Sequence, residues 1–192
     1  MNHASYVLTS LESKSFAAKS RLAASWRRSY EHHGIDPANS ALTNRISQKE
    51  LALRKQNLEQ LISLAEPQLD ELFGLICNSG CSVILTDRNG LILDQRTSAA
   101  DKDSFEEWGL CPGAIWSEST EGTNGIGTCL AEQRPVIIER NQHFLTKNIG
   151  MTCIGVPIHG ANAEIVGVLD VSSARLDHAK TTSSLIAATV KN

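Results

Sequence analysis

The spacing of apolar residues changes near Gly80, and this change limits the folds open to the chain. Before Gly80, apolar residues recur every three or four positions, which predicts amphipathic helices. After it, short apolar runs alternate with turn residues, which predicts strands. No strand–helix–strand repeat occurs in the sequence, so we do not expect a doubly wound parallel sheet. The pattern predicts an α+β protein in which an antiparallel sheet carries its helices on one face.

Two helical regions are predicted before the sheet. The first covers about Ser15–His32 and ends at Gly34–Pro37, because glycine and proline do not readily continue a helix. The second opens with the sequence SQKE at Ser47, which has the spacing of a capping box. Its apolar pattern continues to about Ile76, and Pro67 predicts a kink or a restart within it.

A hairpin and three further strands are predicted to form the sheet. The hairpin lies within Cys81–Gln95 and turns at the dipeptide Asn-Gly, which is a strong hairpin signal. A short polar helix near Asp103–Trp108 follows it. The final segment, Asp177–Val190, again has a helical pattern. The three further strands are predicted at Arg134–Glu139, Met151–His159 and Glu164–Ser172.

The strand at 151–159 alternates between large and small side chains. Ile154, Val156 and Ile158 share one face, which we expect to pack on the terminal helices. Smaller residues, among them Cys153 and Gly155, share the other face and leave room for a cavity over the sheet. Aromatic residues are few, so those flanking the middle of the chain are informative. Trp108, Trp116 and Phe144 either belong to the core or line an apolar ligand pocket.

The glycine-rich run, Ser119–Thr128, holds three glycines, at positions 122, 125 and 127. A phosphate-binding Walker loop needs a lysine after its last glycine, and a dinucleotide-binding loop needs another glycine spacing directly after a strand. The sequence has neither pattern, so nucleotide chemistry is not expected. Thr123 or Asn124 can instead cap a helix that runs to about Glu132. The start of that helix is predicted to form one wall of a pocket.

The sequence offers no convincing catalytic or metal-binding set, and no cofactor is predicted. Its six histidines form no metal-binding pair, and Glu106-Glu107 are interpreted as part of a solvent-exposed face. The cysteines form no CxxC pair and are expected to act as small buried apolar residues, with a reactive thiol as the alternative. These five cysteines are Cys77, Cys81, Cys111, Cys129 and Cys153.

Charge is distributed unevenly along the chain. Residues 1–55 hold nine Lys and Arg against four Asp and Glu, a balance of +5, whereas the whole chain has a net charge of −3. Such a segment either contacts nucleic acid or forms the solvated faces of helices, and we expect the second. No apolar run approaches the roughly 20 residues that span a bilayer, and the N-terminus does not have the pattern of a secretory signal. A cytoplasmic protein without membrane contact is therefore expected.

Several blocks in a fixed order resemble the sensor region of bacterial transcriptional activators of the acetoin-catabolism and dihydroxyacetone-regulator type. The most specific block runs from Glu118 through Gly122-Thr-Asn-Gly-Ile-Gly-Thr128. The resemblance covers about residues 20–190. The other blocks are SRLAASWRRSYEHHGIDP, SVILTDRNGLIL, QHFLTKNIGMTCIGVPIHG and EIVGVLDVSS.

The resemblance implies a GAF fold, with about six antiparallel strands, the N- and C-terminal helices on one face and a small-molecule pocket on the other. It divides the chain into a basic helical extension, residues 1–55, and a sensor domain, residues 56–192, that ends in a truncated signalling helix. Complete members continue into an ATPase module that acts on sigma-54 RNA polymerase and then a helix-turn-helix, and this sequence shows neither motif. Gln142 stands where the family commonly has a glutamate. The residues typical of GAF domains that bind cyclic nucleotides, bilin or haem do not match.

The chain is accordingly predicted to be the ligand-sensing region of a transcriptional activator and not an enzyme. A small metabolite, or a partner protein, would bind over the sheet and change the arrangement of the terminal helices. Those helices, about residues 15–79 and 177–190, are expected to form a homodimer interface, and no direct nucleic-acid contact is expected. One alternative is a thiol-dependent enzyme similar to the GAF-type reductases of free methionine sulfoxide, which would use Cys111, Cys129 and Cys153. Another is a structural dimerisation module. The predicted ligand contacts are Trp116, Asn124, Ile126, Cys129, Phe144 and Cys153.

Overall fold

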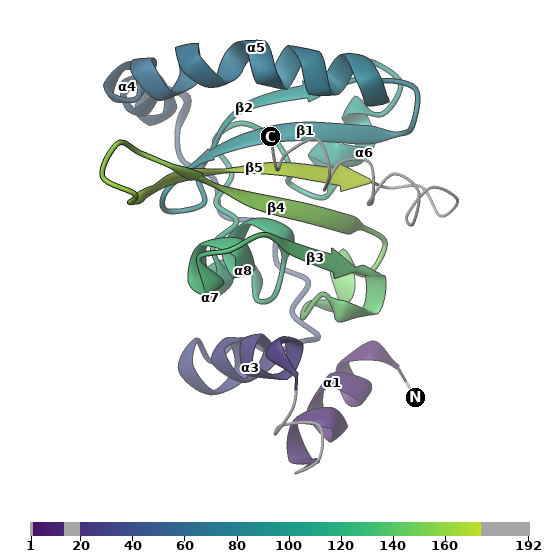
Figure 1. The fold of residues 1–192 in the computed structure, drawn as a ribbon. Helices are drawn as coiled ribbons and strands as arrows, with labels where there is room; N and C mark the ends of the chain where they lie inside the picture. The colour runs from purple at the N-terminus through teal and green to yellow at the C-terminus, as the bar shows by residue number, and fades with distance from the viewer. Residues whose placement is uncertain (1, 14–19, 174–192) are drawn as a thin grey trace.

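The computed structural model of the chain describes residues 2–13 and 20–173 (Figure 1). Its centre is an antiparallel sheet with the strand order β2-β1-β5-β4-β3. The described residues thus form five of the about six strands that the resemblance implies. The strands are β1 (Cys81–Asp87), β2 (Ile92–Thr97), β3 (Val136–Glu139), β4 (Thr152–His159) and β5 (Ile165–Ser173).

The helices lie before the sheet and in the connection between β2 and β3. The α-helices are α1 (His3–Glu12), α3 (Arg21–Arg27), α4 (Gln48–Asn57), α5 (Glu59–Ile76), α6 (Lys102–Glu107), α7 (Glu118–Glu121) and α8 (Gly125–Glu132). A π-helical turn, η1 (Arg28–His32), continues α3, and two 3₁₀ turns, η2 (Arg140–Gln142) and η3 (Thr146–Asn148), follow β3. Every described strand and helix in the 80–173 region was predicted at nearly these positions, apart from the short α7. The helix predicted at Asp177–Val190 lies outside the described residues.

The N-terminal helices differ from the prediction in two respects, and the first is that α1 (His3–Glu12) was not predicted. The helix predicted at Ser15–His32 is helical from Arg21 to His32, and its first residues lie outside the described ranges. The Ser47 hydroxyl caps α4 by accepting the Glu50 N–H at 3.2 Å, as predicted. Of the kink or restart predicted at Pro67, the restart is wrong, because α5 runs through Pro67 and the break falls at Leu58, between α4 and α5. Pro67 is exposed, and the carbonyl group that loses its helical N–H partner is therefore able to bond to water.

The two faces of the sheet are covered differently. On one face α5 packs over the sheet, and its buried Leu69, Leu72 and Ile76 contact Val83 and Ile154. On the opposite face lie α7 and α8, with α1 and α3 beyond them (Figure 1). The helices therefore occupy both faces, not one as the periodicity predicted. The α+β class and the antiparallel sheet are confirmed.

The small-residue face of β4 explains this arrangement. A Cβ added to Gly155 would overlap the Gly125 carbonyl oxygen, and one added to Gly125 would lie 2.6 Å from the Cβ of Cys153. Helix α8 thus fills the space that the small residues were expected to leave as a cavity. The large-residue face, with Ile154, Val156 and Ile158, packs toward α5 as predicted.

The N-terminal extension packs on the end of the domain that carries the glycine-rich run. Trp26 is fully buried, and its Nε1 donates a hydrogen bond to the Gln142 carbonyl at 2.8 Å. It shares an apolar cluster with Val7, Ile35 and Phe144. The predicted division between residues 55 and 56 falls near the end of α4 and stays a prediction. No helix among the described residues is both long and apolar enough to span a bilayer.

Candidate functional site

The glycine-rich run forms the short helix α7, a tight turn and the first turn of α8. Asn124 caps α8, since its Oδ1 accepts the Gly127 N–H at 2.8 Å and its Nδ2 donates to the Gly122 carbonyl at 2.8 Å. Gly122 has a φ of +64°, and an added Cβ would lie 2.7 Å from the Cβ of Phe144. Only glycine meets both requirements without strain. The structure thus confirms the predicted cap and assigns it to Asn124.

Glu118 lies at the start of this run and joins it to α3. Its carboxylate is buried and accepts the Arg28 Nε–H at 2.7 Å, and it also accepts the hydroxyl protons of Ser25 and Thr128. Arg28 Nη2 donates in addition to Glu132 at 2.8 Å, at the end of α8. The hydrogen bond that Arg28 donates to Glu118 raises the pKa of Arg28 above its ordinary value. We name these residues the Glu118 cluster: Ser25, Arg28, Glu118, Thr128 and Glu132.

The sequence did not predict the Glu118 cluster, although both halves of it were noticed. The sequence shows the basic character of residues 1–55 and the block that begins at Glu118 as two unconnected features. Nothing in the local pattern connects Arg28 with a carboxylate 90 positions further on. A buried carboxylate is costly unless it is paired, so the pair fixes how α3 sits on the run.

The six predicted ligand contacts are all buried, and the structure brings three of them together. Trp116, Ile126 and Cys153 belong to one core cluster, which also contains Phe105 and Met151. Trp116 Nε1 donates to the Gly109 carbonyl at 2.9 Å, which fixes the indole at the base of the loop after α6.

The other three predicted contacts lie apart from that cluster. Asn124 acts as the cap of α8. Cys129 packs in a neighbouring cluster with Val136 and Val168, and Phe144 packs with Trp26 in the N-terminal cluster. Each of the six has an exposed fraction of 2% or less, so an effector reaches them only if α8 or a loop moves.

A group of buried polar side chains lies beneath α8, on β4, β5 and the loop before η3. Ser172 Oγ donates to Asp170 Oδ1 at 2.6 Å, whereas Asp170 Oδ2 has no hydrogen-bond partner among the described residues. Burial raises the pKa of Asp170 to about 7. His143 Nε2 lies 3.4 Å from the sulfur of Cys153. Sequence reasoning missed Asp170 and Ser172, because the strand pattern does not show that these two polar positions are buried beneath α8.

The electrostatics of this group do not favour thiol chemistry. Burial lowers the pKa of His143 to about 4, and burial together with the Asp170 charge raises the pKa of Cys153 far above its ordinary value. Burial also raises the pKa of Cys129 to about 12. The reactive form of cysteine is the thiolate, and here the thiols stay protonated beside a neutral imidazole. Within the described residues, no group of three or more His, Cys, Asp or Glu side chains is placed to hold a metal ion.

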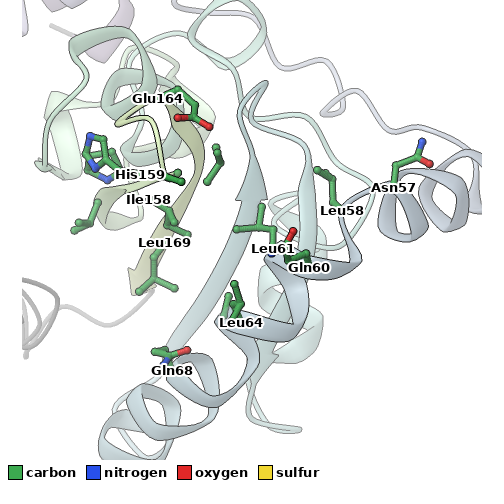
Figure 2. A pocket seen from close by; sticks show the side chains of 16 residues that line it. Asn57, Leu58, Gln60, Leu61, Leu64, Gln68, Ile158, His159, Glu164 and Leu169 are labelled. Atoms are coloured by element: carbon green, nitrogen blue, oxygen red, sulfur yellow. The ribbon is translucent and has the colours of Figure 1, made fainter.

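A groove of about 800 Å³ lies on the other face of the sheet, between α5 and strands β4 and β5 (Figure 2). Its labelled side chains come from the end of α4, from α5 and from the β4–β5 hairpin. The groove contains none of the six predicted ligand contacts. Its main apolar lining residues are Leu58, Leu61, Leu64, Val156, Ile158 and Leu169.

Comparisons with known proteins identify the kind of protein to which this chain is related. The model of the MimR N-terminal domain family matches residues 5–189. The acetoin catabolism regulatory protein of Cupriavidus necator is 29% identical over 161 residues, which cover 84% of this chain and 24% of that protein. The propane 2-monooxygenase operon transcriptional activator MimR of Mycolicibacterium smegmatis is 32% identical over 114 residues, 58% of this chain and 20% of that protein.

A solved structure supports the fold. One chain of the crystal structure of the E. coli DhaR(N)–DhaL complex superimposes with a TM-score of 0.75 at 14% sequence identity, over 88% of this chain and 63% of that chain. The similarity confirms the fold that the resemblance implied.

The relatives are much longer than this chain. The chain spans 24% of the length of the C. necator regulator and 25% of the acetoin dehydrogenase operon activator AcoR of Bacillus subtilis, to which it is 27% identical over 154 residues. These relatives are transcriptional regulators and not enzymes, which confirms the prediction of a regulatory domain. The chain belongs to the MimR N-terminal domain family, a regulatory region of bacterial transcriptional activators.

Proposed function

We propose that this chain is the effector-sensing region of a cytoplasmic, sigma-54-dependent transcriptional activator, and that α3 transmits the state of the core. The observation that carries the proposal is the Glu118 cluster. Arg28, the first residue of the turn η1 that continues α3, bonds to both ends of the segment that contains α7 and α8, at Glu118 and Glu132. Any shift of α8 therefore changes the contacts that hold α3.

The proposed sensing step is a movement of α8 away from the sheet. Gly125 and Gly155 bring α8 into direct backbone contact with β4, so a molecule reaches Trp116, Ile126 and Cys153 only in a conformer where this contact has opened. An effector shifts an equilibrium by its differential affinity for the two conformers. The remaining predicted contacts, Asn124, Cys129 and Phe144, border the same helix and stay part of the proposal.

We further propose that two copies associate through the predicted interface, about residues 15–79 and 177–190, to which α4 and α5 belong. The apolar groove beside α5 supports this, since exposed apolar surface of this kind marks association sites. Leu64 and Leu75 are 68% and 62% exposed on α5, where their spacing of 11 residues puts them on one side of the helix. Downstream ATPase and DNA-binding domains would follow this region in the complete activator.

A protein effector is the second candidate. The similar solved structure is a complex of DhaR(N) with DhaL, which supports a protein as the effector here. The large exposed side chains of Tyr6 and Tyr30, on the N-terminal helical region, favour such an interaction here.

The proposal is tested in the complete activator with a transcriptional reporter. Native mass spectrometry of the freshly purified protein gives the subunit count and the mass of any co-purifying effector. The reporter response to that effector is then measured for Arg28→Ala and for the control Lys102→Ala, whose ammonium group makes an exposed 3.8 Å pair with Glu106 on α6. We expect Arg28→Ala to uncouple effector from transcription and the control to respond normally. A normal response of Arg28→Ala would show that α3 does not transmit the signal.

A further inference from the structure

Strand β3 lies at one edge of the sheet, on the side that faces α3 (Figure 1). An open groove of about 180 Å³ runs between this edge and the helix. Strand residues 136–138 line one side of it, and Arg21, Leu22 and Ser25 of the α3 region line the other. The groove contains none of the six predicted ligand contacts and shares no residue with the groove beside α5.

The register of β3 turns the backbone of Ile137 toward the groove. The Arg140 N–H donates to the Met151 carbonyl at 2.9 Å, so the backbone of Arg140 is directed toward β4. The direction of the N–H and carbonyl groups alternates along an antiparallel strand. Ile138 is therefore also directed toward β4, whereas the N–H and carbonyl of Ile137 point outward. No described residue bonds to either group.

The neighbouring positions offer no further N–H donor at this edge. The Glu139 N–H also points outward, but it donates to Gln142 Oε1 at 2.8 Å. Pro135 has no N–H to offer. An unpaired N–H and carbonyl on an edge strand form a template for another extended chain. The free edge of β3 is therefore centred on Ile137.

The alternation of side chains defines what an added strand presents to each face. Val136 and Ile138 are buried in the cluster that contains Cys129 of α8, so the Ile137 side chain lies on the other face, where it is 43% exposed. In an antiparallel strand added to β3, the residue directly opposite Ile137 would share that face and pack on it. The residues before and after it would point to the face of α8 and α3, into the groove.

The charge of the groove determines which side chains suit those two positions. Arg21 is exposed and forms no ion pair among the described residues. Arg134 Nε lies 3.7 Å from Glu132 Oε2, and the same carboxylate already accepts from Arg28 at 2.8 Å. The lining thus holds two arginines against one carboxylate. Acidic side chains on the added strand would complement this excess of positive charge.

The composition of the chain outside the described ranges does not provide such a strand. Residues 14–19 hold two lysines and no acidic residue, and residues 174–192 hold three Lys and Arg against one Asp. The sheet edge of a second copy does not suit the groove either, because α3 borders its far side. At about 30 Å³ per water-sized group, the groove holds about six non-hydrogen atoms, which is the width of one extended chain.

We infer that the β3 edge binds an extended acidic segment of a partner protein, added antiparallel to β3. Its central residue is apolar and lies opposite Ile137, and carboxylate side chains on either side of it meet Arg21 and Arg134. Thr128 and Glu132 of α8 line the same groove, so the bound segment would contact both α3 and α8. The inference supplies a docking site for the protein effector proposed as the second candidate, and it rests on that candidate for its regulatory meaning alone.

The test is a titration of the complete chain labelled with ¹⁵N-isoleucine, followed by NMR. The probe is the capped peptide Thr-Glu-Ile-Glu-Thr, and the Ile137 amide signal is identified by its loss in Ile137→Val. We expect the probe to shift this signal saturably, with half-saturation on the order of 1 mM for so short a peptide. One control is the same peptide with an N-methyl group on its isoleucine, which removes the N–H that would bond to the Ile137 carbonyl. The other is Thr-Lys-Ile-Lys-Thr, and both controls should bind at least several-fold more weakly.

Matched variants locate the site, with binding followed at the neighbouring Ile138 amide. Ile137→Pro removes the outward N–H without removing a bond of the sheet and should abolish the saturable shift, whereas Ile137→Val should retain it. Arg21→Ala should weaken binding several-fold, and Lys102→Ala, an exposed position on α6, should leave it unchanged. Unchanged indole proton signals of Trp26 and Trp116 report that each variant is folded, and Arg21→Ala still tests the site if the proline variant does not fold.

Four results would overturn the inference: an Ile137 signal that the probe does not move, equal binding of the N-methylated peptide, equal binding of the lysine peptide, or normal binding by Arg21→Ala. An Ile137 signal that shifts with protein concentration alone would place a second copy at this edge and would also overturn it.

Failure of this inference is separable from failure of the proposed function. If the complete activator responds to its effector through Arg28 while the peptide does not bind, the sensing proposal stands and this docking site is wrong. If the peptide binds as expected while Arg28→Ala responds normally, the docking site stands and the proposed transmission through α3 is wrong.

Discussion

Breaking the Arg28–Glu118 pair should destabilise the protein by a predictable amount. Removing one partner of a buried ion pair costs about 3–5 kcal/mol when the other charge stays buried and unpaired. Here the Glu118 side chain is only 4% exposed, but Arg28 is 30% exposed. The hydroxyl groups of Ser25 and Thr128 also continue to bond to the carboxylate after Arg28 is removed. We therefore expect Arg28→Met to cost about 2–3 kcal/mol, below the buried-pair range.

A double-mutant cycle measures the interaction directly. Urea unfolding of the unmodified chain, Arg28→Met, Glu118→Gln and the double variant gives the coupling energy, which we expect to be about 2 kcal/mol. The exposed pair of Arg54 with Glu50, at 3.9 Å on α4, is the control and should give less than about 0.5 kcal/mol. A coupling energy for Arg28 and Glu118 no larger than that of the control would refute the argument that this pair fixes α3.

Three further predictions concern the face beneath α8. Gly155→Ala should lower the free energy of unfolding by about 2 kcal/mol or more, because the methyl group would overlap the Gly125 carbonyl. The control Gly74→Ala, in open space on α5, should raise the free energy of unfolding by up to about 1 kcal/mol. Thermal unfolding in which Gly155→Ala is as stable as Gly74→Ala would contradict the packing of α8 on β4. Asp170 has its pKa raised from 3.8 to about 7, so the folded state binds the extra proton and stability falls as the pH rises from about 4 through 7. This loss of stability reaches about 4 kcal/mol by pH 8, at 1.36 kcal/mol per unit of pKa difference, and Asp170→Asn should remove it. Denaturation of both proteins is measured at pH 5 and pH 8. An equal change in the free energy of unfolding between the two pH values for both proteins would contradict the prediction. Cys129 and Cys153 should react with a thiol reagent only as fast as the protein opens, because burial keeps both thiols protonated. Reaction at the rate of a free thiol would contradict this and favour the alternative of a reactive cysteine.

The parts of the fold that follow from local patterns were predictable. The Asn-Gly hairpin, the cap of α8 at Asn124 and the strand positions depend on turn chemistry and on residue spacing within one segment. The apolar side of β4 was also predictable, because alternation in a strand assigns side chains to faces.

The parts that depend on contacts between distant segments were not predictable. A small residue such as Gly155 leaves space in the sequence pattern, and nothing there says whether a ligand or α8 fills that space. The pairing of Arg28 with Glu118 has no local signature. The continuity of α5 through Pro67 depends on the exposure of the affected carbonyl, which the sequence also does not give.

The candidate site shows the same division. The residues around the glycine-rich run were predicted to contact a ligand, which stays a prediction, and Trp116, Ile126 and Cys153 meet in one core cluster. The Asp170 carboxylate oxygen that has no hydrogen-bond partner among the described residues was not foreseen, because it arises from how separate segments pack.

The central claim is that α3 follows the movement of α8. Hydrogen exchange of the complete chain, with Gly125→Ala compared with the unmodified protein, tests it most directly, since the added methyl group would lie 2.6 Å from the Cβ of Cys153 and must displace α8 from the sheet. The claim predicts faster exchange in both α8 and α3, with α5 unchanged on the opposite face. Faster exchange in α8 with an unchanged α3 would contradict it.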